Sequence, residues 1–198
     1  FCAVLFLFFS LCLISNSYAT NLQLQHAAGG QSTTLVIGDK FWYQAIGEKV
    51  LVLSKNGGAV ISSIDLASPA SALCTDLIIR GKTLYALLDE EEVIELSIDS
   101  SGALSVKKRI GKDDLGILPK SFGTVGKSPV VFGEGGVVRL SDGVNILDFD
   151  GLVNGVAYSL EFGTVYVSDR KIYDGESGRL LGLASNLYEL DKTTNAIA

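Results

Sequence analysis

The chain has 198 residues, of which 47% are hydrophobic, and its 16 Lys and Arg against 22 Asp and Glu give a formal net charge of −6. That length is enough for one domain with a sizeable core. The acidic balance argues against binding to nucleic acid, because neutralising phosphates requires clustered basic side chains. The one basic cluster, Lys107-Lys108-Arg109, is predicted to lie on a solvated strand edge.

The N-terminal run FCAVLFLFFSLCLI carries no charge. A membrane-spanning helix needs about 20 apolar residues, so this run is too short to span. Ser17 and Ala19 are small residues at positions −3 and −1 of a cut after Ala19, which is typical of a secretory signal peptide over residues 1–19. An uncleaved anchor is the alternative. We expect an exported protein, secreted or held in the periplasm or cell envelope, without a membrane span in the mature chain.

Residues 20–39 are expected to form a leader segment before the folded repeats. Cys74 is the one cysteine after the predicted cut, so the mature chain is not a disulfide scaffold. The apolar residues around Cys74 in ALCTDLII predict a buried, inert thiol. The only histidine, His26, lies in the expected leader, where a catalytic base would lack an orienting scaffold.

The apolar residues after the leader follow a period of two, which indicates strands. The clearest runs are TLYALL (83–88), VIELSID (93–99) and ALSVKKRI (103–110), and turn residues bound each of them. The 22 glycines suit many tight turns. The sequence therefore predicts an all-β fold.

The runs group into larger units, whose comparable strands begin at Val50, Leu84, Pro129 and Thr164, in steps of 34, 45 and 35 residues. Repeats of roughly 40 residues with three or four strands have the size of propeller blades. We interpret the longest step as an inserted loop at 113–123. The predicted architecture is a β-propeller over residues 40–198, with about four blades.

The units share a short motif in which two apolar residues flank a Tyr and an Asp follows further along the chain. It is carried by 84–86 with Asp99, and by 165–167 with Asp174. This motif resembles the repeats of YVTN-type and quinoprotein-like β-propellers. The Trp-Asp dipeptide of WD repeats is absent, and so are repeated tryptophan signatures. The resemblance therefore implies a propeller repeat without a quinone, and no cofactor is expected.

A propeller must bring its first and last blades together, or its edge strands stay exposed. Four units followed by LYELDKTTNAIA suggest an open series, and the sequence lacks an initiator Met and a basic segment before its apolar run. We expect a piece of a longer protein, truncated within the propeller. A complete small propeller of four or five blades is the alternative.

Candidate sites are few. Asp148 and Asp150 would point to one side of a strand near Asp142, which offers oxygen ligands for a hard cation such as calcium. A polar turn is the favoured interpretation, because too few ligands are at hand. The acidic run at 89–92, and the three acids of GTVYVSDRKIYDGESGRLLG (163–182), are predicted to be turn residues.

Two further motifs bear on ligand binding. A phosphate-binding loop leads into a helix, whereas GEGG (133–136) precedes VVRL, a predicted strand, so nucleotide binding is not expected. Trp42 lies in the densest aromatic group, with Phe41 and Tyr43 on the opposite face of the strand. An exposed Trp42 is the candidate for stacking on a sugar or a peptide.

These observations predict an exported, non-catalytic β-propeller that binds a protein, peptide or glycan through its loops. The alternative is a fragment of a lactonase-like or quinoprotein-like propeller enzyme, whose catalytic or cofactor residues lie in missing blades. A structural segment for the cell surface or for adhesion is a third interpretation.

Overall fold

The computed structural model describes residues 32–66, 72–159, 163–168, 171–175, 179–183, 190–191 and 196–197. The predicted signal peptide, His26, Asp169 and Glu176 lie outside these ranges. Within them, no helix has the length and apolar character to cross a membrane.

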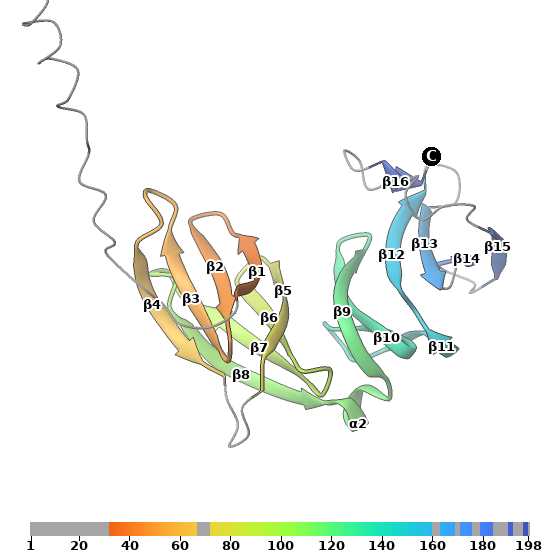
Figure 1. The fold of residues 1–198 in the computed structure, drawn as a ribbon, viewed down its shortest axis with the longest axis horizontal. Coiled ribbons are helices and arrows are strands. Elements are labelled where there is room, and N and C mark those ends of the chain that lie inside the picture. The colour runs from red at the N-terminus through yellow and green to blue at the C-terminus, as the bar shows by residue number, and fades with distance from the viewer. Residues whose placement is uncertain are drawn as a thin grey trace, which may run out of the picture.

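The described residues form an all-β fold of four sheets (Figure 1). The first sheet contains β1 (Ser32–Ile37), β2 (Phe41–Ile46), β3 (Lys49–Ser54) and β4 (Val60–Asp65), paired in that order. The second contains β5 (Cys74–Arg80), β6 (Thr83–Leu88), β7 (Glu92–Ile98) and β8 (Leu104–Gly111), again in chain order. All neighbours in these two sheets are antiparallel, as short hairpins require.

A short helix, α2 (Lys112–Leu115), leads from the second sheet into the third. The third sheet contains β9 (Leu118–Val125), β10 (Ser128–Arg139) and β11 (Asn145–Leu152). The fourth contains β12 (Gly155–Ser159), β13 (Gly163–Ser168), β14 (Lys171–Asp174) and β15 (Leu180–Leu183). The pair β16 (Leu190–Asp191) and β17 (Ala196–Ile197) extends it, with β17 parallel to β12.

β10 is continuous but reverses its direction. An extended strand from Pro129 to Leu140 would span about 36 Å. Instead, the Leu140 N–H donates to the Pro129 carbonyl oxygen at 3.0 Å. Gly135 and Gly136, midway between them, have φ of +100° and +137°, which residues with a side chain rarely adopt. The third sheet therefore has four antiparallel segments, like the first two.

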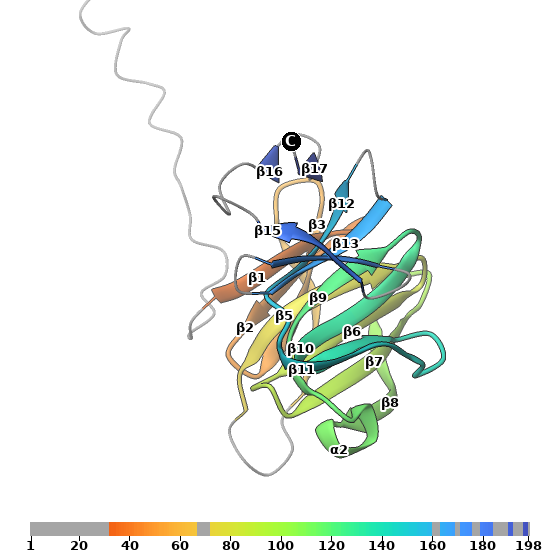
Figure 2. The ribbon, with the colours of Figure 1, turned by 90° about the vertical axis from the view of Figure 1, so that its right-hand side faces the viewer.

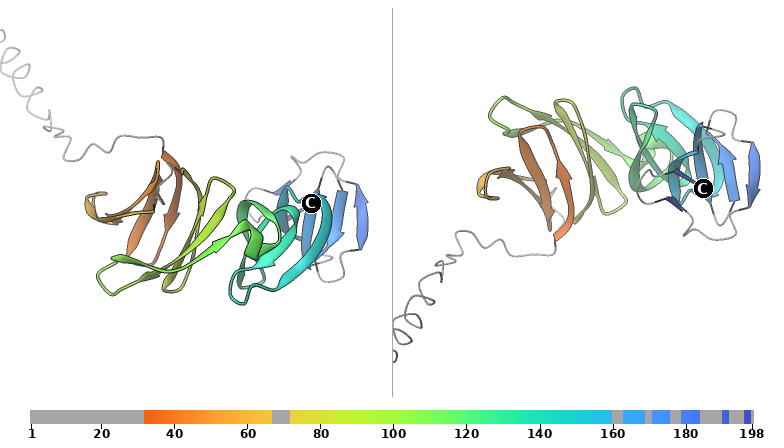
Figure 3. Two further views of the ribbon diagram at one scale, coloured as in Figure 1. Left: turned by 90° about the horizontal axis from the view of Figure 1, so that it is seen from below. Right: turned by 90° about the horizontal axis from the view of Figure 1, so that it is seen from above.

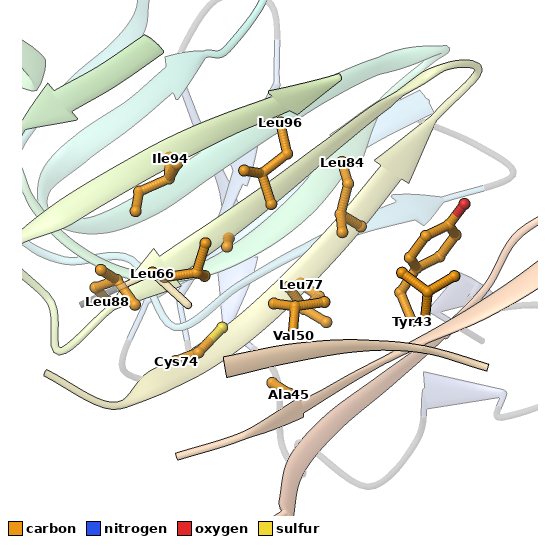
Figure 4. Close-up of a cluster of buried hydrophobic side chains, with 12 residues drawn as sticks. Tyr43, Ala45, Val50, Leu66, Cys74, Leu77, Leu84, Leu88, Ile94 and Leu96 are labelled. Atoms are coloured by element: carbon orange, nitrogen blue, oxygen red, sulfur yellow. The ribbon is translucent and has the colours of Figure 1, made fainter. Parts of the chain in front are cut away.

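The sheets follow one another along the molecule, as both views of Figure 3 show. Figure 2 looks along this series, and the sheets overlap in projection, with α2 at their lower edge. A buried apolar cluster lies between each pair of neighbours: first and second, second and third, third and fourth. Figure 4 shows the first cluster, including Tyr43, Cys74 and Leu84. This stacking explains β6, TLYALL, in which five of six residues are buried because both faces are covered.

The first strands of successive sheets lie beside one another: β1 contacts β5, β5 contacts β9, and β9 contacts β12. Hydrogen bonds also link these strands. The Thr33 hydroxyl donates to the Cys74 carbonyl oxygen across β1 and β5. Asp76 on β5 accepts bonds from the Ser121 hydroxyl at 2.6 Å and the Phe122 N–H at 2.8 Å on β9. These bonds fix the relative position of neighbouring sheets.

The structure corrects three expectations about boundaries. Ser32–Ile37, placed in the leader, is the strand β1, so the first sheet begins before residue 40. β2, and not the strand at Val50, therefore corresponds to β6 as the second strand of its sheet. The expected loop at 113–123 is mostly α2 and β9. The strands β1 and β9 were missed because polar residues such as Ser32, Thr33 and Lys120 weaken their apolar pattern.

Candidate functional site

The largest cavity that we describe lies beside α2, and we call it the α2 cavity. Its volume is about 570 Å³, and it is open to solvent. Three connections form it: α2 with its following turn, the reversal of β10, and the end of β11. Its lining residues are Lys112, Asp113, Gly116, Ile117, Leu118, Glu134, Gly135, Phe149, Asp150 and Gly151.

The local backbone explains why these segments meet. Gly116 ends α2 in the left-handed conformation, with φ of +70°, and its N–H donates to the Lys112 carbonyl oxygen at 2.9 Å. Glu134, the last residue before the reversal at Gly135, pairs with Leu118 of β9 in the sheet. Both turns depend on a glycine with positive φ, so the backbone itself sets the shape of the cavity.

An aromatic side chain forms one wall of the α2 cavity. The ring of Phe149 packs edge-to-face on Tyr173 of the fourth sheet, with centroids 5.0 Å apart and an interplanar angle of 69°. Such a contact fixes the ring on a neighbouring sheet. The ring of Phe149, held by Tyr173, therefore gives the cavity an apolar surface beside its charged residues.

The lining is acidic. It contains the carboxylates of Asp113, Glu134 and Asp150 and a single cation, Lys112. The Lys112 ammonium is engaged outside the cavity by Glu91, at 2.6 Å, and that hydrogen bond raises the pKa of Lys112. Negative charge therefore dominates the cavity, and it favours a positively charged group.

Of the two aspartates predicted to bind a cation, only one lies in this site. Asp148 and Asp150 are both exposed on β11, as expected from alternation, but only Asp150 lines the cavity. Asp142 instead accepts bonds from Arg139 Nε at 3.0 Å and the Val144 N–H at 3.2 Å within its own turn. Among the described residues, no three His, Cys, Asp or Glu side chains converge on a metal position.

Trp42 lies elsewhere, half-buried on β2 between Ile37 of β1 and Leu53 of β3. Phe41 and Tyr43 belong to the core between the first two sheets, so alternation places Trp42 on the outer face of the first sheet. Leu35, Ile37 and Ile61 are exposed large hydrophobic residues of this sheet.

The acidic residues 89–92 form a hydrogen bond and salt bridges with residues of neighbouring segments. Asp89 Oδ2 accepts the Leu73 N–H at 2.7 Å, and Glu92 pairs with Arg109 at 2.6 Å. Glu90 pairs with Lys120, and Glu91 with Lys112. The run thus links the β6–β7 turn to β8, α2 and β9. Residues 89–91 form the turn, as predicted, whereas Glu92 is the first residue of β7.

Sequence reasoning missed Asp113, Glu134 and Phe149 as site residues. The sequence predicts only that a strand, VVRL, follows the GEGG motif, and Val137 to Arg139 do belong to the strand β10. Asp113 falls in the segment that the sequence predicts to be an inserted loop. No local pattern connects these two residues with Asp150, because they are distant in sequence and meet only through the packing of α2, β10 and β11.

No family model matches the chain, and no curated protein matches it. Solved structures do match, 280 chains in all. One is the crystal structure of the computationally designed Ika8 protein, with 14% sequence identity and a TM-score of 0.55. The match covers 77% of this chain and 48% of that one, so the chain spans about half the length of the designed protein. At this identity the likeness shows the fold alone.

Proposed function

We propose that the four sheets are consecutive blades of a β-propeller. The support is that the first strands of neighbouring sheets lie side by side, and that an apolar cluster fills the space between each pair of sheets. Radial repetition of four-stranded sheets has this arrangement. The predicted signal peptide supports an exported protein acting outside the cytoplasm.

On this framework, we propose a non-catalytic binding protein that holds a positively charged segment of a protein or peptide partner. The observation that carries the proposal is the α2 cavity, whose lining includes three acidic residues and Phe149, the ring that packs on Tyr173. A Lys or Arg side chain satisfies both features, because its charged end pairs with carboxylates and its stem or guanidinium packs on an aromatic ring.

Binding of fluorescein-labelled peptides to the full chain, followed by fluorescence anisotropy, tests this proposal. We compare an Arg-rich peptide with a Glu-rich peptide of equal length and with a neutral oligosaccharide. The variant Asp113→Asn, Glu134→Gln, Asp150→Asn removes the cavity charge. The matched control Asp114→Asn, Glu48→Gln, Asp148→Asn removes the same charge outside the cavity.

The Arg-rich peptide is expected to bind, and the cavity variant to weaken that binding about 10-fold, since three solvated ion pairs are lost. The control variant should stay within about 2-fold, an effect of long-range charge alone. Equal losses in the two variants, or equal binding of the Glu-rich peptide, would overturn the proposal. Preference for the oligosaccharide would replace the basic partner with a glycan.

A further inference from the structure

A second cavity, which we call the Tyr43 cavity, lies between the first two sheets. Its volume is about 220 Å³. Asp99 and Ser100, which line it, precede β8, whereas the α2 cavity begins at Lys112, just after β8. The two cavities therefore lie at opposite ends of β8, and binding in the Tyr43 cavity does not depend on the function proposed for the α2 cavity.

Tyr43 provides the most informative contact in this cavity. Its side chain is 2% exposed and belongs to the core between the sheets, yet it also lines the cavity. In Figure 4 its hydroxyl points away from the neighbouring apolar side chains. Among the described residues we find no hydrogen-bond partner for this hydroxyl. In the described residues Ser62 Oγ is the one fully buried side-chain polar atom without a partner, so the Tyr43 hydroxyl is not sealed in the core and can donate into the cavity.

The Tyr43 hydroxyl acts as a donor at neutral pH. Burial, with a smaller contribution from the nearby Asp99 carboxylate, raises the pKa of Tyr43 above its ordinary value of 10.0. The phenol therefore keeps its proton. A ligand oxygen with lone pairs, as in a carboxylate or a carbonyl group, complements it.

The charged residues at the cavity narrow the ligand class. Lys40 and Lys82 line it, and neither makes a salt bridge to another described residue. The Asp99 carboxylate is occupied by its own turn, since Oδ1 accepts the Ser101 N–H at 2.8 Å, the Ser101 hydroxyl at 2.6 Å and the Ala103 N–H at 2.9 Å. Within the described part of the chain, the lining thus holds two lysines that make no salt bridge and two carboxylates, and one of these, that of Asp99, is held in its own turn through Oδ1.

The remaining walls are apolar and already formed. They are the side chains of Phe41, Ile79 and Ile98. The ring of Phe41 lies against Gly102, where an added Cβ would come within 2.6 Å of Phe41 Cδ2, and φ of Gly102 is +88°. Glycine at this turn lets the β7–β8 connection close over the ring, which fixes the wall without a ligand.

From these contacts we propose that the Tyr43 cavity binds a small organic carboxylate with a compact apolar body, such as an aromatic monocarboxylate. The carboxylate accepts a hydrogen bond from the Tyr43 hydroxyl and pairs with Lys82 or Lys40. The apolar body packs on Phe41, Ile79 and Ile98. A preformed apolar cavity with a few convergent polar groups is the usual form of a small-molecule site.

The test is a titration of the full chain with 4-fluorobenzoate, followed by the line width of its ¹⁹F NMR signal. We expect saturable binding below about 10 mM, which suits a ligand of this size. Tyr43→Phe keeps the ring and removes the donor, and should weaken binding about 5-fold. Tyr85→Phe is the matched control, because Tyr85 is also a buried tyrosine but packs between the second and third sheets.

Lys82→Gln, on the β5–β6 turn, gives an independent readout if Tyr43→Phe fails to fold. It should weaken binding of 4-fluorobenzoate but leave that of the neutral analogue 4-fluorobenzyl alcohol within about 2-fold, because only the charged probe uses the ammonium. Absence of saturable binding overturns the proposal. So does equal affinity of the wild type, Tyr43→Phe and Lys82→Gln for 4-fluorobenzoate.

Discussion

Cys74 shows how burial controls chemistry at a single residue. Its side chain is fully buried between the first two sheets. Burial, assisted by the negative charge of Asp76, raises the pKa of the Cys74 thiol to about 12. The reactive form of a cysteine is the thiolate, so this thiol is inert in the folded protein. The buried thiol expected from ALCTDLII is confirmed.

The first prediction concerns the reactivity of Cys74. A chain without residues 1–19, and therefore without its two other cysteines, should not react with Ellman's reagent at about pH 8, because the thiol is both inaccessible and protonated. In about 8 M urea it should react completely within minutes. Absorbance of the released thiolate measures both. Reaction at equal rates with and without urea would show that Cys74 is not buried.

The second prediction concerns alkaline pH. The folded thiol titrates near 12 and the unfolded thiol near 9.0, so above pH 9 the folded state binds more protons than the unfolded state. The contribution to stability is therefore complete below about pH 9 and lost as pH rises toward 12. Tyr166, whose pKa burial raises to about 12, acts in the same direction above its ordinary value of 10.0.

Urea unfolding at about pH 7, 9 and 10.5 measures this loss. We expect the free energy of unfolding to fall between the last two values. Cys74→Ala, although less stable at every pH because it leaves a cavity, should fall less steeply. An identical pH dependence of the two proteins would exclude the thiol as a cause.

At the scale of one element, β10 shows that glycine permits a close approach between neighbouring strands. An added Cβ at Gly136 would lie 1.8 Å from the Leu147 carbonyl oxygen, and one at Gly133 would lie 2.0 Å from that of Leu118. Both atoms belong to neighbouring strands, so they cannot move without breaking the sheet. These glycines allow β10 to reverse while it remains paired with β9 and β11.

The third prediction follows from this contact. Gly136→Ala should destabilise the protein by more than about 3 kcal/mol or prevent folding, because it adds a backbone clash to an unfavourable φ of +137°. Gly143→Ala is the control: Gly143 also has a positive φ, +72°, but nothing lies near the added Cβ. It should cost about 1 kcal/mol. Urea unfolding compares them, and equal costs would contradict the reversal.

Elements with uninterrupted apolar runs were predictable from the sequence. β6 matches the predicted TLYALL strand residue for residue, and β7 matches the predicted VIELSID strand to within one residue at each end. β1 was missed because STTLVI begins with polar residues, and its pairing with β2 supplies the hydrogen bonds that the local pattern does not reveal. Propensity is a weak guide where the tertiary partner decides.

At the scale of the whole molecule, neighbouring sheets are joined by apolar clusters and by a few polar bonds between their first strands. Asp76 is the clearest of these. One carboxylate oxygen accepts two bonds from β9, and the other accepts the Leu77 N–H at 2.8 Å. The carboxylate thus accepts hydrogen bonds both from its own strand and from the next sheet.

The fourth prediction tests this connection. Asp76→Ala leaves the Phe122 N–H and the Ser121 hydroxyl without their acceptor between two sheets, and should cost about 1–3 kcal/mol of unfolding free energy. Asp148→Ala, at an exposed position of β11, should change it by less than about 0.5 kcal/mol. Chemical denaturation measures both values. If the two substitutions cost the same, the bonds of Asp76 do not hold the sheets together.

The sequence by itself determined the all-β class, the positions of the strongest strands and the burial of Cys74. These follow from period-two hydrophobicity and local turn chemistry, which act over a few residues. Only the tertiary structure decided the sites. It brought Asp150 to Asp113 and Glu134 and left Asp148 outside, and it placed the Tyr43 hydroxyl in a cavity between two sheets. The physical reason is that sheet packing joins residues far apart in the chain, and no local pattern records which strand ends meet.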